Sequence, residues 1–201
     1  MRYAEPYFRL EKCARIVNDL AQGKPCDLLD VGCGPATLGR LVRENINYFG
    51  MDIAIHRPAP FLRELDFSKN RIAFDDKLFD IVVMAGVFEY LGGLQNQKFT
   101  EVIKLLKPGG KFVVTYTNFQ HLNDKRVDHT IYNNMRTIAA FKQDLEVYFQ
   151  VERWFPSSHN WQCSEPRRKV LKQIQMPLEH SIPIISRLFA LNYFFICSPK
   201  S

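Results

Sequence analysis

The chain has 201 residues, of which 46% are hydrophobic and 24% charged, the composition of a globular protein of one domain. Its formal net charge of +6 is modest, so nucleic acid is allowed as a partner but not indicated. The cysteines form no Cys-x-x-Cys pair and no zinc spacing, which argues against a metal site. We expect a cytoplasmic protein, because no apolar stretch is long enough to span a bilayer and the first residues lack a signal sequence.

The first half of the chain alternates helical patterns with short apolar runs, as in a parallel sheet covered by helices on both faces. A helix is predicted over residues 7–21, and it ends at a Gly-Lys-Pro signal. A strand over 27–31, a helix over 35–44 and a strand over 47–51 form one βαβ unit. An extended segment at 62–67, a strand at 79–84, a helix at 94–106 and a strand at 111–116 follow.

The last third of the chain gives weaker signals. It predicts a polar loop at 118–134, a helix at 137–144, a strand-rich segment at 147–154, a basic helical segment at 165–175 and a final strand at 193–197. Two late strands after five parallel ones indicate an antiparallel hairpin at the end of the chain. The predicted fold is therefore α/β: a Rossmann-like, doubly wound, seven-stranded and mainly parallel sheet with an antiparallel C-terminal hairpin and helices on both faces.

A glycine-rich turn joins the first predicted strand to the next helix. Gly32, Cys33 and Gly34 follow Asp30, and glycines at such a turn let backbone N–H groups approach a ligand. Asp52 ends the next strand, 20 residues after Gly32, the spacing at which an acid binds the ribose hydroxyls of an adenosine cofactor. The structural alternative is that the glycines only make a tight turn while Asp52 caps a helix.

Two further acidic residues weaken that structural alternative. Asp66 and Glu89 also lie at the ends of predicted strands, and open parallel sheets bind ligands at the carboxyl edge of their strands. Four acidic positions at one edge favour a ligand site over a simple turn.

Four motifs in this order resemble those of class I S-adenosylmethionine-dependent methyltransferases. They are LLDVGCG at 28–34, GMD at 50–52, FDIVV at 79–83 leading into GVFEYL at 86–91, and LKPGGKF at 106–112. The resemblance covers residues 26–118. An NAD-binding protein is the rival interpretation, but its fingerprint requires Gly or Ala where Thr37 stands. Two positions depart from the family pattern: Ala36 replaces the usual third glycine, and Tyr90 replaces a frequent histidine.

The resemblance implies S-adenosylmethionine as cofactor, S-adenosylhomocysteine as product and no metal. It implies one domain over 1–201, with an N-terminal helix or lid at 1–24, a cofactor-binding half at 25–117 and an acceptor-side third at 118–201. The residues implied to contact the cofactor run from its amino-acid portion to its adenine. They are Asp30, Gly32, Cys33 and Gly34 around the amino-acid portion, Ala85, Gly86 and Val87 along the methionine chain, Asp52 at the ribose, and Ile53, Asp66 and Phe67 at the adenine.

The methyl acceptor leaves no motif in the sequence. An oxygen acceptor would need a base, and the candidates are Glu89, Tyr90 and His121, with His121 in the loop after the fifth predicted strand ranked first among the histidines. A short, aromatic and mildly basic C-terminal third favours a small-molecule or carbohydrate-type acceptor, which could be anionic. RNA or protein is the alternative acceptor, and a non-catalytic cofactor-binding or scaffolding partner is the alternative of another class. The oligomeric state is not predicted.

Overall fold

The structure of the protein is a computed structural model, which describes residues 7–119, 135–159 and 190–200. The helices are α1 (Tyr7–Ala21), α2 (Thr37–Leu41), α3 (Gln95–Leu105) and α4 (Ile138–Tyr148), with 3-10 helices η1 (Phe88–Tyr90) and η2 (Gly92–Leu94). The strands are β1 (Cys26–Val31), β2 (Ile46–Asp52), β3 (Leu62–Glu64), β4 (Phe79–Ala85), β5 (Leu106–Thr117), β6 (Phe149–His159) and β7 (Ala190–Pro199).

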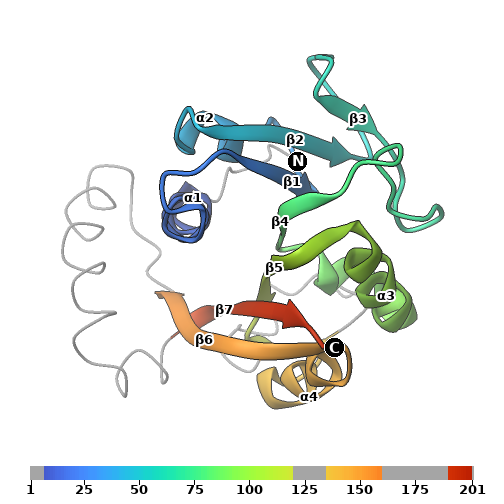
Figure 1. The fold of residues 1–201 in the computed structure, drawn as a ribbon. Coiled ribbons are helices and arrows are strands. Elements are labelled where there is room, and N and C mark those ends of the chain that lie inside the picture. Colours follow the sequence, from blue (N-terminus) through green and yellow to red (C-terminus); the bar gives the residue numbers. More distant parts are fainter. Residues whose placement is uncertain (1–6, 120–134, 160–189, 201) are drawn as a thin grey trace, which may run out of the picture.

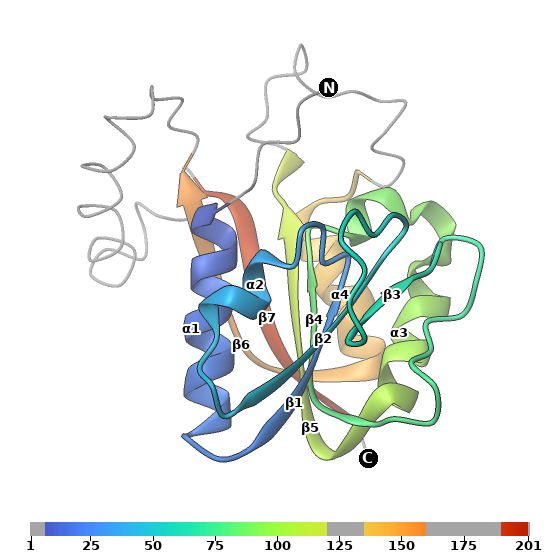
Figure 2. The ribbon, with the colours of Figure 1, turned by 90° about the horizontal axis from the view of Figure 1, so that it is seen from above.

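Within the described residues, seven strands form one sheet in the order β3-β2-β1-β4-β5-β7-β6 (Figure 1). The strands β1 to β5 pair in parallel, and β7 pairs antiparallel with both β5 and β6. The carboxyl ends of the parallel strands therefore share one edge, which lies towards the top of the sheet in Figure 2. This arrangement confirms the predicted fold class, including the antiparallel pair at the end of the chain.

Helices cover both faces of the sheet (Figure 1). One face carries α1 and α2, whose apolar side chains pack with β1 and β4 in a core that includes Val17, Leu28 and Ile81. The other face carries α3 and α4 over an aromatic core in which Phe88 stacks on Phe99 with ring centroids 4.8 Å apart. Because helices cover β4 on both faces, its sequence is a nearly continuous apolar run, as is typical of such strands.

The Leu-Lys-Pro-Gly-Gly motif lies at the edge of the sheet opposite the carboxyl ends. Lys107 Nζ donates to the carboxylates of Asp27, at 2.9 Å, and Asp80, at 2.8 Å, so it joins the starts of β1, β4 and β5. A β-carbon on Gly110 would lie 2.9 Å from the Lys107 carbonyl oxygen, which explains the glycine there. The motif therefore stabilises the opposite edge of the sheet and contributes no residue to the carboxyl edge.

The structure corrects several predicted boundaries. The helix predicted over 35–44 is only Thr37–Leu41, because Ala36 has a left-handed backbone (φ 57) and Val42 is extended. The extended segment predicted over 62–67 is a strand only as far as Glu64, and the strand predicted to begin at 111 begins at Leu106. The predicted basic helix at 165–175 and most of the predicted polar loop lie outside the described residues.

No helix among the described residues is long and apolar enough to cross a membrane.

Candidate functional site

The glycine turn after β1 depends on a close contact with the end of β4. Gly32 has φ +80, and a β-carbon there would lie 2.5 Å from Val87 Cγ2. Only glycine fits such a position without a shift of the neighbour. The N–H groups of Gly32 and Cys33 donate to the Met51 carbonyl oxygen at 2.8 and 3.1 Å. These two N–H groups therefore hold β1 to β2, which corrects the expectation that they face a ligand.

Asp52 lies at the end of β2 and binds the same turn. Its carboxylate accepts hydrogen bonds from Gly34 N and from Ile53 N, both at 2.7 Å. These contacts fix the carboxylate at the carboxyl edge of the sheet and exclude the alternative in which Asp52 caps a helix. The side chain of Ile53 is 59% exposed, an apolar surface directly beside the fixed carboxylate. Each carboxylate oxygen keeps acceptor capacity for a further donor.

Asp30 is a buried acid at the end of β1, with only 2% of its surface exposed. Its carboxylate accepts a hydrogen bond of 2.8 Å from Tyr48 Oη on β2. Burial raises the pKa of Asp30 to about 7, and the nearby charge of Asp52 raises it further, while the Tyr48 hydrogen bond and the charge of Arg9 lower it. The acid is thus poised to ionise near neutral pH, where a cationic ligand group would favour its charged form.

The sequence did not point to Tyr48 as a site residue. Its position depends on the short helix α2. A β-carbon on Gly39 would lie 2.7 Å from the Tyr48 ring, so the glycine of this short helix lets the ring reach Asp30. Tyrosine in a strand after a glycine turn gives no local signal of such a contact, because the partner lies on another strand.

The side chain of Cys33 packs inward. Cys33 is buried, and burial raises the pKa of its thiol to about 12, so the thiol stays protonated at physiological pH. It lies against Gly50, where a β-carbon would come within 2.9 Å of Sγ. The thiol therefore packs within the turn.

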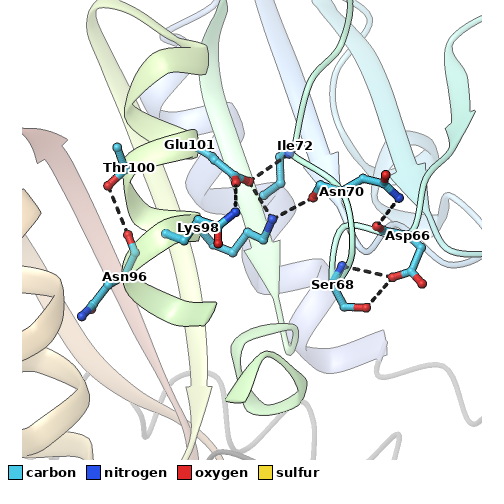
Figure 3. A network of polar contacts seen from close by, with 9 residues as sticks. Asp66, Ser68, Asn70, Ile72, Asn96, Lys98, Thr100 and Glu101 are labelled. Carbon is cyan, nitrogen blue, oxygen red and sulfur yellow. Dashed lines mark hydrogen bonds and ion pairs between the residues drawn. The ribbon is translucent and has the colours of Figure 1, made fainter. Parts of the chain in front are cut away.

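Asp66 begins a loop that follows β3 (Figure 3). Its carboxylate accepts hydrogen bonds from the backbone N–H of Ser68 at 3.1 Å and from the Ser68 hydroxyl at 2.5 Å, and it pairs with Lys69 at 3.0 Å. These contacts lower the pKa of Asp66 to about 2, so it is ionised at neutral pH. The next residue, Phe67, is buried and lies beside Gly32.

A buried ion pair holds this loop to α3 (Figure 3). Lys98 is 1% exposed, and its Nζ donates to the Asn70 carbonyl oxygen and to Glu101, both at 2.8 Å. Glu101 in turn accepts a hydrogen bond of 2.9 Å from Ile72 N. Asp66 is therefore on a loop whose far end is fixed to the body of the domain.

The end of β4 brings three predicted residues to the same edge. Ala85 and Val87 are buried, and Gly86 between them has φ +74. The guanidinium of Arg9, from α1, lies against Gly86, since a β-carbon there would be 2.5 Å from Arg9 Nη1. The sequence did not single out Arg9, which reads as one polar position of an amphipathic helix.

The catalytic candidates differ in their surroundings. Glu89 is 1% exposed, and its Oε1 accepts hydrogen bonds from Thr117 N at 2.8 Å and from the Thr117 hydroxyl at 2.7 Å. Burial raises the pKa of Glu89. Tyr90, on the same 3-10 helix, is exposed. His121 lies outside the described residues, so its predicted role stays a prediction.

Comparison with known proteins identifies the family. Residues 3–175 match the family model of a methyltransferase domain. The chain belongs to this methyltransferase family. The match confirms the resemblance stated from the motifs, and the protein is therefore an enzyme of the methyltransferase class. A search of curated proteins finds no significant match.

Solved structures with the same fold share little sequence with this methyltransferase. An S-adenosylmethionine-dependent methyltransferase from Archaeoglobus fulgidus is 17% identical, with a TM-score of 0.66 over 98% of this chain and 97% of that one. A TehB-like methyltransferase from Corynebacterium glutamicum is 17% identical, with a TM-score of 0.61 over 95% and 88%. A Haloferax volcanii protein solved with the methyltransferase activator Trm112 is 17% identical, with a TM-score of 0.62 over 95% and 94%. These likenesses support the fold.

Proposed function

We propose that this methyltransferase uses S-adenosylmethionine to methylate a small-molecule or carbohydrate-type acceptor. The observation that carries the donor assignment is the fixed carboxylate of Asp52 beside the exposed side chain of Ile53. A carboxylate held by backbone N–H groups suits the two hydroxyls of a ribose, and an exposed apolar side chain suits the face of an adenine.

Other residues at the edge fit the remaining parts of this cofactor. The buried acid Asp30 suits a positively charged ammonium group at the amino-acid end. Gly32 and Gly86, both at positive φ, add no side chain of their own after the ends of β1 and β4. The proposed contacts are those implied by the sequence: Asp30, Gly32, Cys33, Gly34, Asp52, Ile53, Asp66, Phe67, Ala85, Gly86 and Val87.

The chemistry requires few catalytic residues. When bound, the sulfonium of S-adenosylmethionine supplies an activated methyl group for in-line displacement by the acceptor. The chain has to align the acceptor and exclude water. An oxygen or nitrogen acceptor also loses a proton, and Glu89 is the best supported base because its Oε2 is buried and has no hydrogen-bond partner among the described residues. Tyr90 and His121 remain the other proposed candidates.

The segment after β5 is short, aromatic and mildly basic in sequence, which supports a small acceptor. The net charge of +6 favours an anionic acceptor, and it is also the one feature that supports RNA.

Transfer of a labelled methyl group separates these acceptors. The protein is incubated with methyl-tritiated S-adenosylmethionine and three fractions of a cell extract: the low-molecular-weight filtrate, purified RNA and dialysed protein. We expect label in the filtrate alone, and less of it with the Asp52→Ala variant when the cofactor is subsaturating. Label in RNA or protein would contradict the small-molecule proposal. Cofactor binding without transfer to any fraction would favour a non-catalytic partner.

A further inference from the structure

Three polar side chains meet where β4 and β5 end and β7 begins. Glu89 follows β4 on η1, Thr117 is the last residue of β5, and Asn192 is paired with Thr117 across the sheet on β7. The Thr117 hydroxyl oxygen lies between the other two side chains, 2.7 Å from Glu89 Oε1 and 3.2 Å from Asn192 Oδ1. The order of the strands thus joins three segments that are far apart in the sequence.

The Thr117 hydroxyl has one proton for two hydrogen-bond acceptors. Glu89 Oε1 and Asn192 Oδ1 both accept, and a hydroxyl donates to only one oxygen at a time. An ionised carboxylate is the stronger acceptor, and the distance to Glu89 is the shorter one. The hydroxyl therefore donates to Glu89 while that residue is ionised.

The two carboxylate oxygens of Glu89 have different surroundings. Oε1 accepts hydrogen bonds from the N–H and the hydroxyl of Thr117, at 2.8 and 2.7 Å. Oε2 is buried and has no hydrogen-bond partner within the described part of the chain. Because the two donors stabilise negative charge on Oε1, a proton is taken up at Oε2. The neutral carboxyl that results attracts the hydroxyl less, so the Asn192 oxygen then becomes the competing acceptor.

The charges near Glu89 are consistent with this role of the hydroxyl. Burial raises the pKa of Glu89, while the hydrogen bond from Thr117 and the charge of Arg9 on α1 lower it. Tyr116 is a titratable neighbour, and burial together with the charge of Glu89 raises its pKa to about 12, so it stays neutral around neutral pH. The Thr117 hydroxyl is thus an uncharged group that sets the proton affinity of Glu89.

We propose that Thr117 is a positioning residue for Glu89: its hydroxyl donates to Oε1 while Glu89 is ionised and turns to Asn192 Oδ1 when Oε2 takes up a proton. This inference rests on the proposed function, in which Glu89 is the base. In the transfer, the nucleophilic atom of the substrate bonds to the methyl carbon, and the carbon–sulfur bond breaks with its electron pair left on sulfur. The proton of the nucleophile passes to Glu89 Oε2.

The first test is a titration of Glu89 by carboxyl NMR in protein that carries ¹³C-labelled glutamate, with the signal assigned by its absence from Glu89→Gln. Thr117→Val removes the hydroxyl and keeps the backbone N–H, so the midpoint should rise by about 1 pH unit. Asn192→Leu removes the acceptor that serves the protonated arrangement, so the midpoint should fall.

Two further variants are controls for this titration. Thr117→Ser keeps the hydroxyl and should match the wild type. Thr115→Val is the matched control for Thr117→Val, because Thr115 is a buried threonine of the same strand whose hydroxyl has no partner among the described residues. It should leave the midpoint unchanged.

The second test follows the rate of labelled methyl transfer to the low-molecular-weight filtrate as a function of pH. In Thr117→Val the acidic limb of the profile should move upwards with the NMR midpoint, so the rate falls most at low pH. At high pH, where Glu89 is ionised in both proteins, the rate should be within about 2-fold of the wild type. A merely structural role of Thr117 would lower the rate by the same factor at every pH.

The outcomes separate this inference from the proposed function. An unchanged Glu89 midpoint in either Thr117→Val or Asn192→Leu, shifts of the same sign in both variants, or a uniform loss of rate in Thr117→Val overturns the inference. A wild type that transfers nothing to the filtrate, or a Glu89→Gln variant that transfers at the wild-type rate, contradicts the proposed function instead.

Discussion

The buried carboxyl of Asp30 makes stability depend on pH in a predictable direction. Its pKa is raised from 3.8 to about 7 by burial, so the folded protein holds a proton that the unfolded chain releases. The stabilisation from this proton is fully present below about pH 4 and is lost as the pH rises through about 7. Tyr48 and Arg9 oppose the shift and Asp52 adds to it.

The Asp30→Asn variant is expected to remove this dependence, because an amide does not titrate. The gain in melting temperature of the variant over the wild type should be at least about 3 °C larger at pH 8 than at pH 5. Glu89 is unchanged in both proteins, so its own titration cancels in the comparison. Equal differences at both pH values would show that Asp30 does not titrate in this range.

Ala36 carries a conformational cost that the family's usual glycine would not. Its φ of 57 places an alanine in the left-handed region immediately before α2. The Ala36→Gly variant should therefore raise the free energy of unfolding by about 1 kcal/mol, measured by urea denaturation. Ala139→Gly, in the right-handed helix α4, should lower it by about 0.5–1 kcal/mol. A loss of stability in both variants would contradict the assigned backbone conformation.

At the scale of elements, the loop after β3 depends on the ion pair between Lys98 and Glu101 (Figure 3). Lys98→Met would leave Glu101 buried without its partner, and we expect a loss of about 3–5 kcal/mol in the free energy of unfolding. Hydrogen exchange at the amide of Ile72 should accelerate more than exchange within β1. The control is Thr100→Ala, which removes only an exposed hydrogen bond of 3.2 Å to the Asn96 carbonyl on the same helix. Unchanged exchange at Ile72 would show that the loop is held by other contacts.

Most elements could be predicted from the sequence because their signals are local. The apolar run of β4 and the Gly-Lys-Pro end of α1 each fix an element without knowledge of its neighbours. The length of α2 could not be predicted, because it depends on the left-handed backbone of Ala36, which alanine rarely adopts. The four acids of the site could be predicted, because they stand at strand ends with a recognisable spacing. Tyr48 and Arg9 could not be predicted, because they reach the site through contacts between distant segments of the chain.

At the scale of the whole molecule, the sheet is completed by the last described strand. Among the described strands, β7 lies between β5 and β6, so β6 pairs with the sheet through β7 alone. Phe195 on β7 is fully buried and lies 5.4 Å from the ring of Phe141 on α4. The C-terminal strand therefore belongs to the same core as the helices over the aromatic face.

Truncation of this side chain should weaken the whole domain. We expect Phe195→Ala to lower the free energy of unfolding by about 3–5 kcal/mol, with fluorescence and circular dichroism reporting one shared transition. Leu78→Ala, at a side chain that is 42% exposed, should change it by less than about 1 kcal/mol. Two separate transitions in the Phe195→Ala variant would show instead that the C-terminal strands fold apart from the parallel sheet.

The central claim is that the carboxyl edge between β2, β1 and β4 binds an S-adenosyl cofactor. Calorimetric titration with S-adenosylhomocysteine, alongside NAD and the Asp52→Ala variant, tests it most directly. We predict saturable binding of S-adenosylhomocysteine alone, weakened by about 1–3 kcal/mol in Asp52→Ala through the lost ribose hydrogen bonds. Binding of NAD, binding of neither ligand, or an unchanged affinity in a folded Asp52→Ala variant would contradict the account.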